Sequence, residues 1–296
     1  MERAVVLGAI VSAGLLALTV VGQTPAPRPP LGTIAKLADN LYMIPGAGGN
    51  SAVMVMSNGV LLVDTKDPNN GQGILDQIRS VTDKPVTHII NTHTHGDHTG
   101  SNVFFPASVE VVAQENTRAN MERMAAFQSD AGKVGLPDRT YKGRLTLFSG
   151  RDAVDLYYFG PAHTSGDSFV VFREARVMHA GDVFARKAQP YLDANNGGSG
   201  LEIGETIASA AATIKNVDRV LTGHDAVFPW KDFVEFGEFN RVVARDARAA
   251  HAAGKPAEQA AAEFRVPASF TGYSVNSMFG GLPANYRVIY AELERK

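Results

Sequence analysis

Short apolar runs, separated by turn signals, recur along the first two thirds of the chain and predict a strand-rich architecture. Apolar runs of four to eight residues that are continuous or alternate with polar residues are typical of buried or half-buried strands. An Asn58-Gly59 pair between two such runs predicts a hairpin. The segments predicted as strands are residues 33–44, 52–56, 60–64, 86–91 and 109–113, then LTLF, AVDLYYF, SFVVF and ARVMHAGD up to Asp182, and DRVLTG before His224.

Helical spacing replaces this pattern at a few places. Apolar residues at Ile74, Leu75, Ile78 and Val81 lie on one face of a helix over residues 72–81. Further helices are predicted at residues 115–127 and 201–214, and the chain is largely helical from Trp230 to a final helix at 286–294. Two β-rich halves, each ending in a helix, indicate an α/β (α+β) fold in which two sheets pack face to face with helices outside.

The N-terminal pattern differs from the rest. Residues 4–22 form one apolar run after Arg3, which is typical of an export signal, although Glu2 weakens the charged start. The run is long enough that an uncleaved membrane anchor is an alternative, whereas the proline-rich TPAPRPP at 24–30 argues against a buried core helix. We therefore divide the chain into a signal peptide or anchor (1–26), a linker (27–32) and one domain (33–296), and expect a periplasmic or secreted protein.

Composition limits the metal ligands and the binding partners that the chain can have. The chain has no cysteine, which excludes disulfides and thiolate metal sites and leaves its eight histidines and its carboxylates as metal ligands. The formal net charge of −2 and the lack of a dense Lys/Arg run give no basis for binding nucleic acid. A small-molecule substrate is the partner expected, with a membrane contact only if the N-terminal segment stays uncleaved.

The segment His93-Thr94-His95-Gly96-Asp97-His98 follows a predicted buried strand and is the strongest chemical signal. Residues two apart in an extended chain share a side, so His93 and His95 face one way. Gly96 allows a sharp turn, and Asp97 and His98 then come from the reversed backbone just before a helix expected to start at 99–100. Imidazole and carboxylate are suitable ligands for Zn²⁺, with Mn²⁺ or Fe as alternatives.

Three later residues repeat one arrangement, an apolar strand followed by a small residue and then a potential ligand. They are His163 in GPAHTSGD, Asp182 in HAGD and His224 in LTGHD. Each alone is as well explained by a surface loop, but loops at strand ends are where scaffolds place catalytic groups. No metal role is predicted for the other histidines.

These motifs, in this order, resemble the metallo-β-lactamase superfamily over roughly residues 33–229. The resemblance implies a four-layer αββα sandwich of two mixed β-sheets flanked by helices. It also implies that His93, His95 and His163 hold one metal ion, that Asp97, His98 and His224 hold a second, and that Asp182 bridges both. Asp64 matches the buried aspartate that supports the His-rich loop in the family, although a strand-end cap is an equally good interpretation.

The function implied is that of a dinuclear zinc hydrolase, β-lactamase-like, in which a hydroxide that bridges two Zn²⁺ ions attacks an acyl bond. Asp97 is the residue expected to orient this nucleophile and shuttle its proton. Asp182 is unlike true β-lactamases, which lack a bridging aspartate, and resembles glyoxalase II, so a lactonase or thioesterase is an alternative. A non-haem iron oxidoreductase on the same ligands and a non-enzymatic metal-binding protein are further alternatives. Residues 125–142 and 184–200 are expected to shape the pocket.

Overall fold

The computed structural model describes residues 30–275 and 278–295, and two β-sheets form its centre. The first sheet has seven strands in the order of the chain. Pairing is antiparallel from β1 to β4 and parallel from β4 to β7, so the sheet is mixed. Its strands are β1 (Ala35–Lys36), β2 (Leu41–Ile44), β3 (Ser51–Met56), β4 (Gly59–Val63), β5 (Val86–Ile90), β6 (Glu110–Gln114) and β7 (Arg139–Tyr141).

The second sheet has six strands in the order β13-β12-β11-β10-β9-β8. It is also mixed, because β11 and β12 run parallel while the other neighbours run antiparallel. Its strands are β8 (Arg144–Leu147), β9 (Val154–Tyr157), β10 (Phe169–Phe172), β11 (Val177–His179), β12 (Arg219–Leu221) and β13 (Val227–Pro229).

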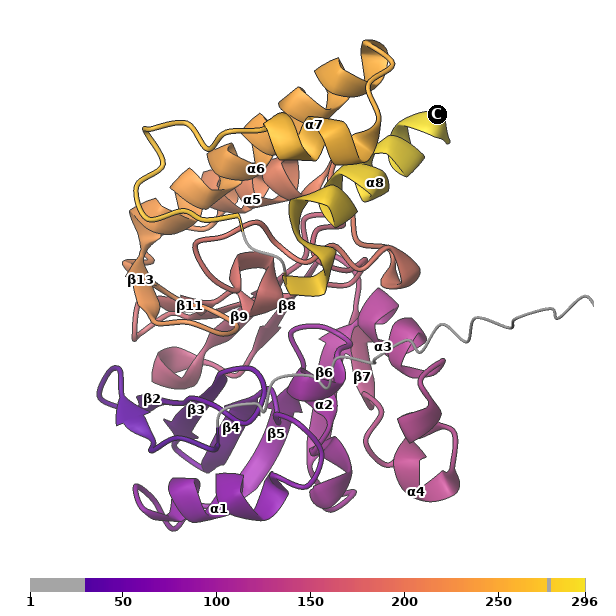
Figure 1. The fold of residues 1–296 in the computed structure, drawn as a ribbon. Coiled ribbons are helices and arrows are strands. Elements are labelled where there is room, and N and C mark those ends of the chain that lie inside the picture. Colours follow the sequence, from indigo (N-terminus) through magenta and orange to yellow (C-terminus); the bar gives the residue numbers. More distant parts are fainter. Residues whose placement is uncertain (1–29, 276–277, 296) are drawn as a thin grey trace, which may run out of the picture.

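Helices cover the outer face of each sheet (Figure 1). On the first half lie α1 (Gly71–Arg79), α2 (Gly96–Thr99), α3 (Glu115–Met121) and α4 (Asp130–Lys133). On the second half lie α5 (Ile203–Thr213), α6 (Trp230–Ala252), α7 (Ala257–Glu263) and α8 (Gly281–Glu294). Short 3₁₀ turns connect them: η1 (Asn102–Phe104), η2 (Ala125–Phe127), η3 (Gly150–Asp152), η4 (Gly181–Phe184), η5 (Ala194–Asn196) and η6 (Met278–Gly280).

The alternation of side chains along the strands produces three hydrophobic layers. On β4, Val60 and Leu62 pack toward α1, whereas Leu61 and Val63 pack between the two sheets. On β10, Phe172 joins the same inter-sheet core, and neighbouring residues on the opposite face pack under α5, α6 and α8. Both faces of each sheet are thus buried, and the predicted αββα sandwich is confirmed.

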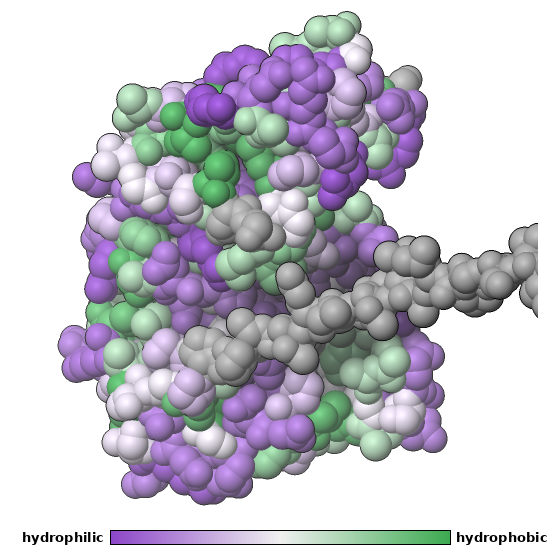
Figure 2. Space-filling model, viewed as in Figure 1, coloured by the Kyte–Doolittle hydropathy of each residue, from purple (hydrophilic) through white to green (hydrophobic). Residues whose placement is uncertain are grey.

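The outer helices turn polar faces to solvent. Figure 2 shows hydrophilic residues over α7 and α8, while Leu282, Tyr286 and Ile289 of α8 are buried against the core beneath. This is the amphipathic arrangement expected of helices that cover a sheet.

Several predicted elements differ in extent from the structure. The helix predicted at 115–127 ends at Met121, and residues 125–127 form the separate turn η2. The helix expected to start at 99–100 begins instead at Gly96, so Asp97 and His98 lie on it. Strands β7 and β13 were not predicted, because three-residue segments such as RTY and VFP carry no periodic pattern of their own.

The predicted signal or anchor at 1–26 lies outside the described residues, as does most of the linker. Within the described part of the chain, no helix combines the length and apolarity needed to cross a membrane.

Candidate metal centre

The structure brings all seven residues that we predicted as metal ligands to one edge of the sandwich. Each lies in a loop, turn or short helix in the segment that follows a strand, where backbone direction changes and side chains leave the packed core. The first sheet supplies His93 and His95 after β5, with Asp97 and His98 on α2. The second half supplies His163 between β9 and β10, Asp182 on η4 and His224 after β12.

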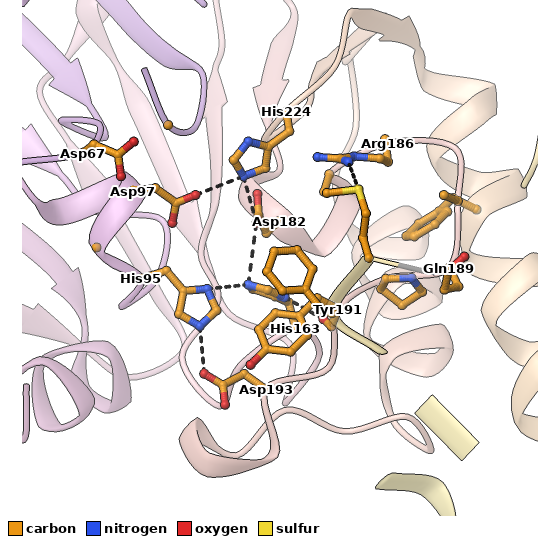
Figure 3. A pocket seen from close by; sticks show the side chains of 18 of the residues that line it. Asp67, His95, Asp97, His163, Asp182, Arg186, Gln189, Tyr191, Asp193 and His224 are labelled. Atoms are coloured by element: carbon orange, nitrogen blue, oxygen red, sulfur yellow. Dashed lines mark hydrogen bonds and ion pairs between the residues drawn. The ribbon is translucent and has the colours of Figure 1, made fainter. Parts of the chain in front are cut away.

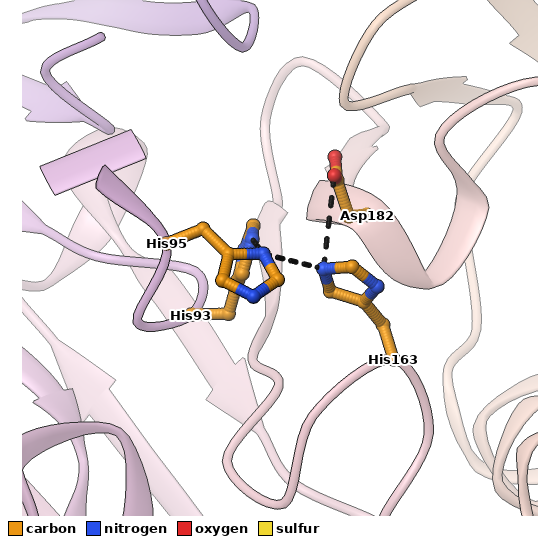
Figure 4. A group of neighbouring side chains, drawn as sticks. All are labelled: His93, His95, His163 and Asp182. Atoms are coloured by element: carbon orange, nitrogen blue, oxygen red, sulfur yellow. Dashed lines mark hydrogen bonds and ion pairs between the residues drawn. The ribbon is translucent and has the colours of Figure 1, made fainter. Parts of the chain in front are cut away.

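These residues form two groups. Within each group, the potential ligand atoms all lie within 4.8 Å of one another. The first group consists of His93, His95, His163 and Asp182, and the second group of Asp97, His98 and His224. Figure 4 shows the first group, in which three imidazoles and one carboxylate point toward a common centre. His95 Nδ1 lies 3.2 Å from His93 Nε2 and 2.9 Å from His163 Nε2.

Asp182 lies between the two groups. Its Oδ2 is 3.7 Å from His163 Nε2 in the first group and 3.2 Å from His224 Nε2 in the second. Its Oδ1 is 3.3 Å from His98 Nε2. The second group closes through Asp97, whose Oδ2 lies 3.5 Å from His224 Nε2. One carboxylate therefore reaches both groups, as a bridging ligand must.

The outer ring nitrogens of two first-group histidines, His95 and His163, are fixed by one loop of the second half (Figure 3). His95 Nε2 donates to Asp193 Oδ2 at 2.7 Å, and His163 Nδ1 donates to the carbonyl oxygen of Tyr191 at 2.7 Å. Because each acceptor has no hydrogen to give, the proton lies on the outer nitrogen and the inner nitrogen keeps its lone pair.

Asp64 fixes the remaining two buried histidines. His98 Nδ1 donates to Asp64 Oδ2 at 2.6 Å, as the family resemblance implied. Thr92 Oγ1 donates to the same oxygen at 2.6 Å and accepts from His93 Nδ1 at 3.0 Å. Asp64 has a left-handed φ of 61°, a conformation that aspartate tolerates better than most residues. A single carboxylate thus orients one histidine of each group.

The donor set fits a pair of divalent cations. Lone-pair nitrogens such as His95 Nδ1 and His163 Nε2 face each other at 2.9 Å, which is repulsive unless a cation lies between them. Asp182 Oδ1 is buried and accepts no hydrogen bond, although His98 Nε2 is 3.3 Å away. Nitrogen and carboxylate donors at four positions are typical of Zn²⁺ sites, so the residues present fit this ion.

Burial and neighbouring charges lower the pKa of some ligand side chains and raise the pKa of others. Burial and the neighbouring imidazole of His95 lower the pKa of His163 to about 4. Burial opposes the charge on His98 as well, but the carboxylates of Asp182 and Asp64 outweigh it and raise its pKa well above its ordinary value. The histidines His224 and His98 hold the pKa of Asp182 well below its usual range, although burial alone would raise it. The carboxylate of Asp182, which lies between the two groups, is therefore held as an anion.

A cavity of about 660 Å³ opens beside the two groups. The ring of Tyr191 stacks on Phe279 with centroids 4.7 Å apart, and the Tyr191 centroid lies 5.8 Å from that of His95. Arg186 lines the same cavity, with Nη1 3.0 Å from the sulfur of Met278. An aromatic wall and a guanidinium thus border the metal centre.

The prediction that residues 184–200 shape the pocket is confirmed, because residues 185, 186, 188–191 and 193 line the cavity. The prediction for residues 125–142 is wrong, since the lining contains none of them. That segment packs elsewhere, for example through Gly135, whose carbonyl oxygen accepts from Asn102.

Three functional positions were not singled out from the sequence: Arg186, Asp193 and Phe279. Asp193 contacts a histidine 98 positions away, and Phe279 reaches the cavity from the C-terminal helical part. The sequence did contain a signal for Asp193. It is a carboxylate two residues after Tyr191, in a loop that also has a turn-forming Asn-Asn-Gly-Gly run.

Comparisons with known proteins agree with this geometry. The sequence model of one family, described as the metallo-beta-lactamase superfamily, matches residues 44–247. The chain is 32% identical over 128 residues to the 2,4-dinitroanisole O-demethylase subunit alpha of Nocardioides sp. (strain JS1661), which is 42% of this chain and 38% of that protein. It is 29% identical over 119 residues to the hydroxyacylglutathione hydrolase of Synechococcus sp. (strain JA-3-3Ab), 39% of this chain and 41% of that one. The chain thus spans less than half the length of either relative.

Solved structures show the same fold. The sec-alkylsulfatase Pisa1 from Pseudomonas sp. superimposes with a TM-score of 0.74 at 16% identity, covering 88% of this chain and 50% of that one. The DIM-1 metallo-beta-lactamase superimposes with a TM-score of 0.59 at 17% identity, covering 72% of this chain and 99% of that one. At these identities the likeness concerns the arrangement of sheets and helices alone.

Proposed function

Because the chain belongs to the metallo-beta-lactamase superfamily, we propose that it is a hydrolase that holds one divalent cation in each of the two ligand groups, with Asp182 as the shared ligand. Zinc is the proposed ion, and Mn²⁺ or Fe is an alternative for the same donors. The observation that carries this proposal is the convergence of the ligand atoms on two centres, with the inner nitrogens of His95 and His163 held as lone pairs by their outer hydrogen bonds.

Two bound cations would lower the pKa of a water molecule and polarise the bond to be cleaved. Asp97 is proposed as the catalytic residue because it is a carboxylate of the second group that also lines the cavity. From this position its Oδ2 can orient a water molecule and accept its proton, then pass it to the leaving group.

The proposed substrate is a small molecule with an acyl bond, such as an ester, thioester, lactone or β-lactam. The apolar wall of Tyr191 and Phe279 favours a substrate with an aromatic or alkyl group. Arg186 favours a negative charge on the substrate in the same cavity, because a guanidinium binds carboxylates with charge-assisted hydrogen bonds. The bridging position of Asp182 favours the ester, thioester and lactone members of this set, since β-lactamases lack that aspartate.

Export to the periplasm or the medium is also proposed, on the apolar run at residues 4–22. Expression of the full chain in a Gram-negative host, followed by N-terminal sequencing of the periplasmic product, tests it. A protein that stays in the cytoplasm with its original N-terminus would contradict this proposal.

The function is tested with the purified, zinc-loaded chain on a matched panel of chromogenic ester, thioester, lactone and β-lactam substrates. We expect hydrolysis of at least one class that a chelator abolishes and zinc restores. Asp97→Asn should reduce turnover by about 100-fold or more, because proton transfer by a positioned carboxylate contributes that much. Silence across the panel, or hydrolysis by the variant at the wild-type rate, would contradict the proposal.

A further inference from the structure

Lys66 is a fully buried lysine that has no part in the chemistry proposed above. Its Nζ donates to the carbonyl oxygens of Ile44 and Gly49, each at 2.7 Å. Burying an amine is costly unless it is fully hydrogen-bonded, and burial lowers the pKa of Lys66 to about 7 although two nearby carboxylates oppose that shift. The charged and the neutral amine of Lys66 each carry enough hydrogens to donate to both carbonyl oxygens. In either state, Lys66 therefore links the two ends of the glycine-rich loop at residues 45–50.

This 45–50 loop lies directly against the second ligand group. The backbone nitrogen of Gly49 donates to the carbonyl oxygen of Asp97 at 2.9 Å. A Cβ on Gly49 would lie 2.1 Å from Cε1 of the His98 ring, so the bare backbone is in contact with this imidazole. The loop therefore limits where both Asp97 and His98 can move.

The same loop also holds the opposite side of the second group through Asn50. The side-chain amide of Asn50 donates to the carbonyl oxygens of Thr222 at 2.9 Å and Asp225 at 2.8 Å. Its backbone nitrogen donates to the carbonyl oxygen of Gly223 at 2.7 Å. These three acceptors surround His224 in the sequence, so Asn50 fixes the turn that carries this ligand from the second sheet.

We propose that Lys66 and Asn50 are positioning residues for the second metal ion, acting through the 45–50 loop. This inference rests on the proposed dinuclear function and adds the means by which its second site is assembled from two halves of the fold. The histidines of the first group are oriented by Asp193, Tyr191 and Thr92, and none of these three residues belongs to the 45–50 loop. We call the hydrogen bonds of Lys66 and Asn50 described above the clamp. Its loss should therefore weaken the second metal site and spare the first.

Titration of the metal-free full chain with Co²⁺, followed by d–d absorption and by metal counting, tests the proposal. Lys66→Met and Asn50→Ala should each bind the first equivalent as the wild type does and the second about 10-fold or more weakly, the usual effect of removing an outer partner of a metal site. Lys66→Arg, which keeps a donor at that position, should recover part of the lost affinity.

Matched controls use the same residue types at remote sites. Lys84 donates to the carbonyl oxygen of Met56 and Asn240 to that of Phe236, and neither contacts the 45–50 loop. Lys84→Met and Asn240→Ala should bind both equivalents with wild-type affinity, even where their thermal midpoints fall. Circular dichroism confirms folding, and the two clamp variants give independent readings if one of them does not fold.

The two possible failures are distinguishable. Wild-type protein that binds a single equivalent would contradict the dinuclear function and the clamp with it. Wild-type protein that binds two equivalents, together with clamp variants whose two affinities are unchanged or fall equally, would contradict the clamp alone.

Discussion

At two positions beside the ligand groups, the backbone comes so close to a ligand that no side chain larger than hydrogen fits. A Cβ on Gly223 would lie 1.8 Å from Asp182 Oδ1, and one on Gly49 would lie 2.1 Å from the ring of His98. Such contacts are far shorter than any van der Waals distance, so a substitution must displace the ligand or the turn. Glycine at these positions is thus part of the metal centre, although it binds nothing.

Gly223→Ala should therefore displace the Asp182 carboxylate and weaken metal binding by on the order of 10- to 100-fold, as the loss of an orienting contact does elsewhere. Competition with a chromogenic chelator measures this affinity. The control is Gly143→Ala, since a Cβ at Gly143 meets no atom within 4 Å. Unchanged affinity in Gly223→Ala would show that Asp182 is not held where the structure places it.

Arg186 gives a second prediction at the residue scale, which concerns the substrate. Arg186→Ala should raise KM by about 10-fold for substrates with a carboxylate, because a hydrogen bond to a charged group contributes about 1.5–3 kcal/mol and 1.4 kcal/mol is tenfold in affinity. The kcat for these substrates should change little, since the guanidinium is not a metal ligand.

The matched control for this measurement is a substrate with the same acyl bond and a neutral methyl ester in place of the carboxylate. Its KM should be the same for wild type and Arg186→Ala. An equal rise in KM for both substrates would mean that Arg186 shapes the cavity and does not recognise charge.

At the scale of elements, the strands of the second sheet are joined by a buried carboxylate. Asp155 on β9 accepts from Thr146 on β8 at 2.6 Å and from Arg173, which follows β10, at 2.7 Å. Burial opposes the charge of Asp155, but the hydrogen bonds from Arg173 and Thr146 lower its pKa to about 2. Because this value lies below that of an unfolded aspartate, the carboxylate stabilises the fold above about pH 4, and this contribution is lost as pH falls toward 2.

Asp155→Asn should accordingly lower the free energy of unfolding by about 1 kcal/mol at pH 7, a value reduced because the arginine partners are half exposed. The difference from wild type should shrink as pH falls from 5 to 3, as measured by urea unfolding. Asp218→Asn is the control, since Asp218 pairs with Arg176 on the surface and should show no resolvable change. A difference that stays constant over this pH range would rule out the ionised carboxylate as its cause.

The elements show what the sequence could and could not predict. Residues 60–64 were predictable as a strand because a short, continuous apolar run after a hairpin signal is typical of a strand buried on both faces. The early end of α3 was not predictable, since Met124 leaves the helix to contact Thr94 in the ligand loop, and no local pattern encodes that contact. At the site, the ligands of the first motif and the three later ligands that each follow a strand and a small residue were predicted. Asp193 was not, because its contact with His95 has no such local pattern.

At the scale of the whole molecule, both halves of the sandwich contribute residues to the two ligand groups. The first half supplies His93, His95, Asp97 and His98, and the second half supplies His163, Asp182 and His224. The proposed cations would bind the folded state, in which these residues are brought together, and not the unfolded chain. Their binding would therefore stabilise the fold by mass action.

Removal of the metal should therefore lower the thermal midpoint of the chain. With free zinc at about 100 times Kd, the stabilisation is about 2.7 kcal/mol, which corresponds to a shift of about 5–10 °C for a domain of this size. Scanning calorimetry before and after dialysis against a chelator measures it, with readdition of zinc as the control. An unchanged midpoint would mean that bound ions do not bridge the two halves.

The most direct test of the dinuclear metal centre is a titration of the metal-free chain with zinc, in which bound ions and hydrolysis are measured in the same samples. The proposed centre predicts saturation at two ions per chain, with hydrolysis absent before zinc is added and appearing as the sites fill. Saturation at one ion per chain or fewer, or hydrolysis at full rate without metal, would contradict it.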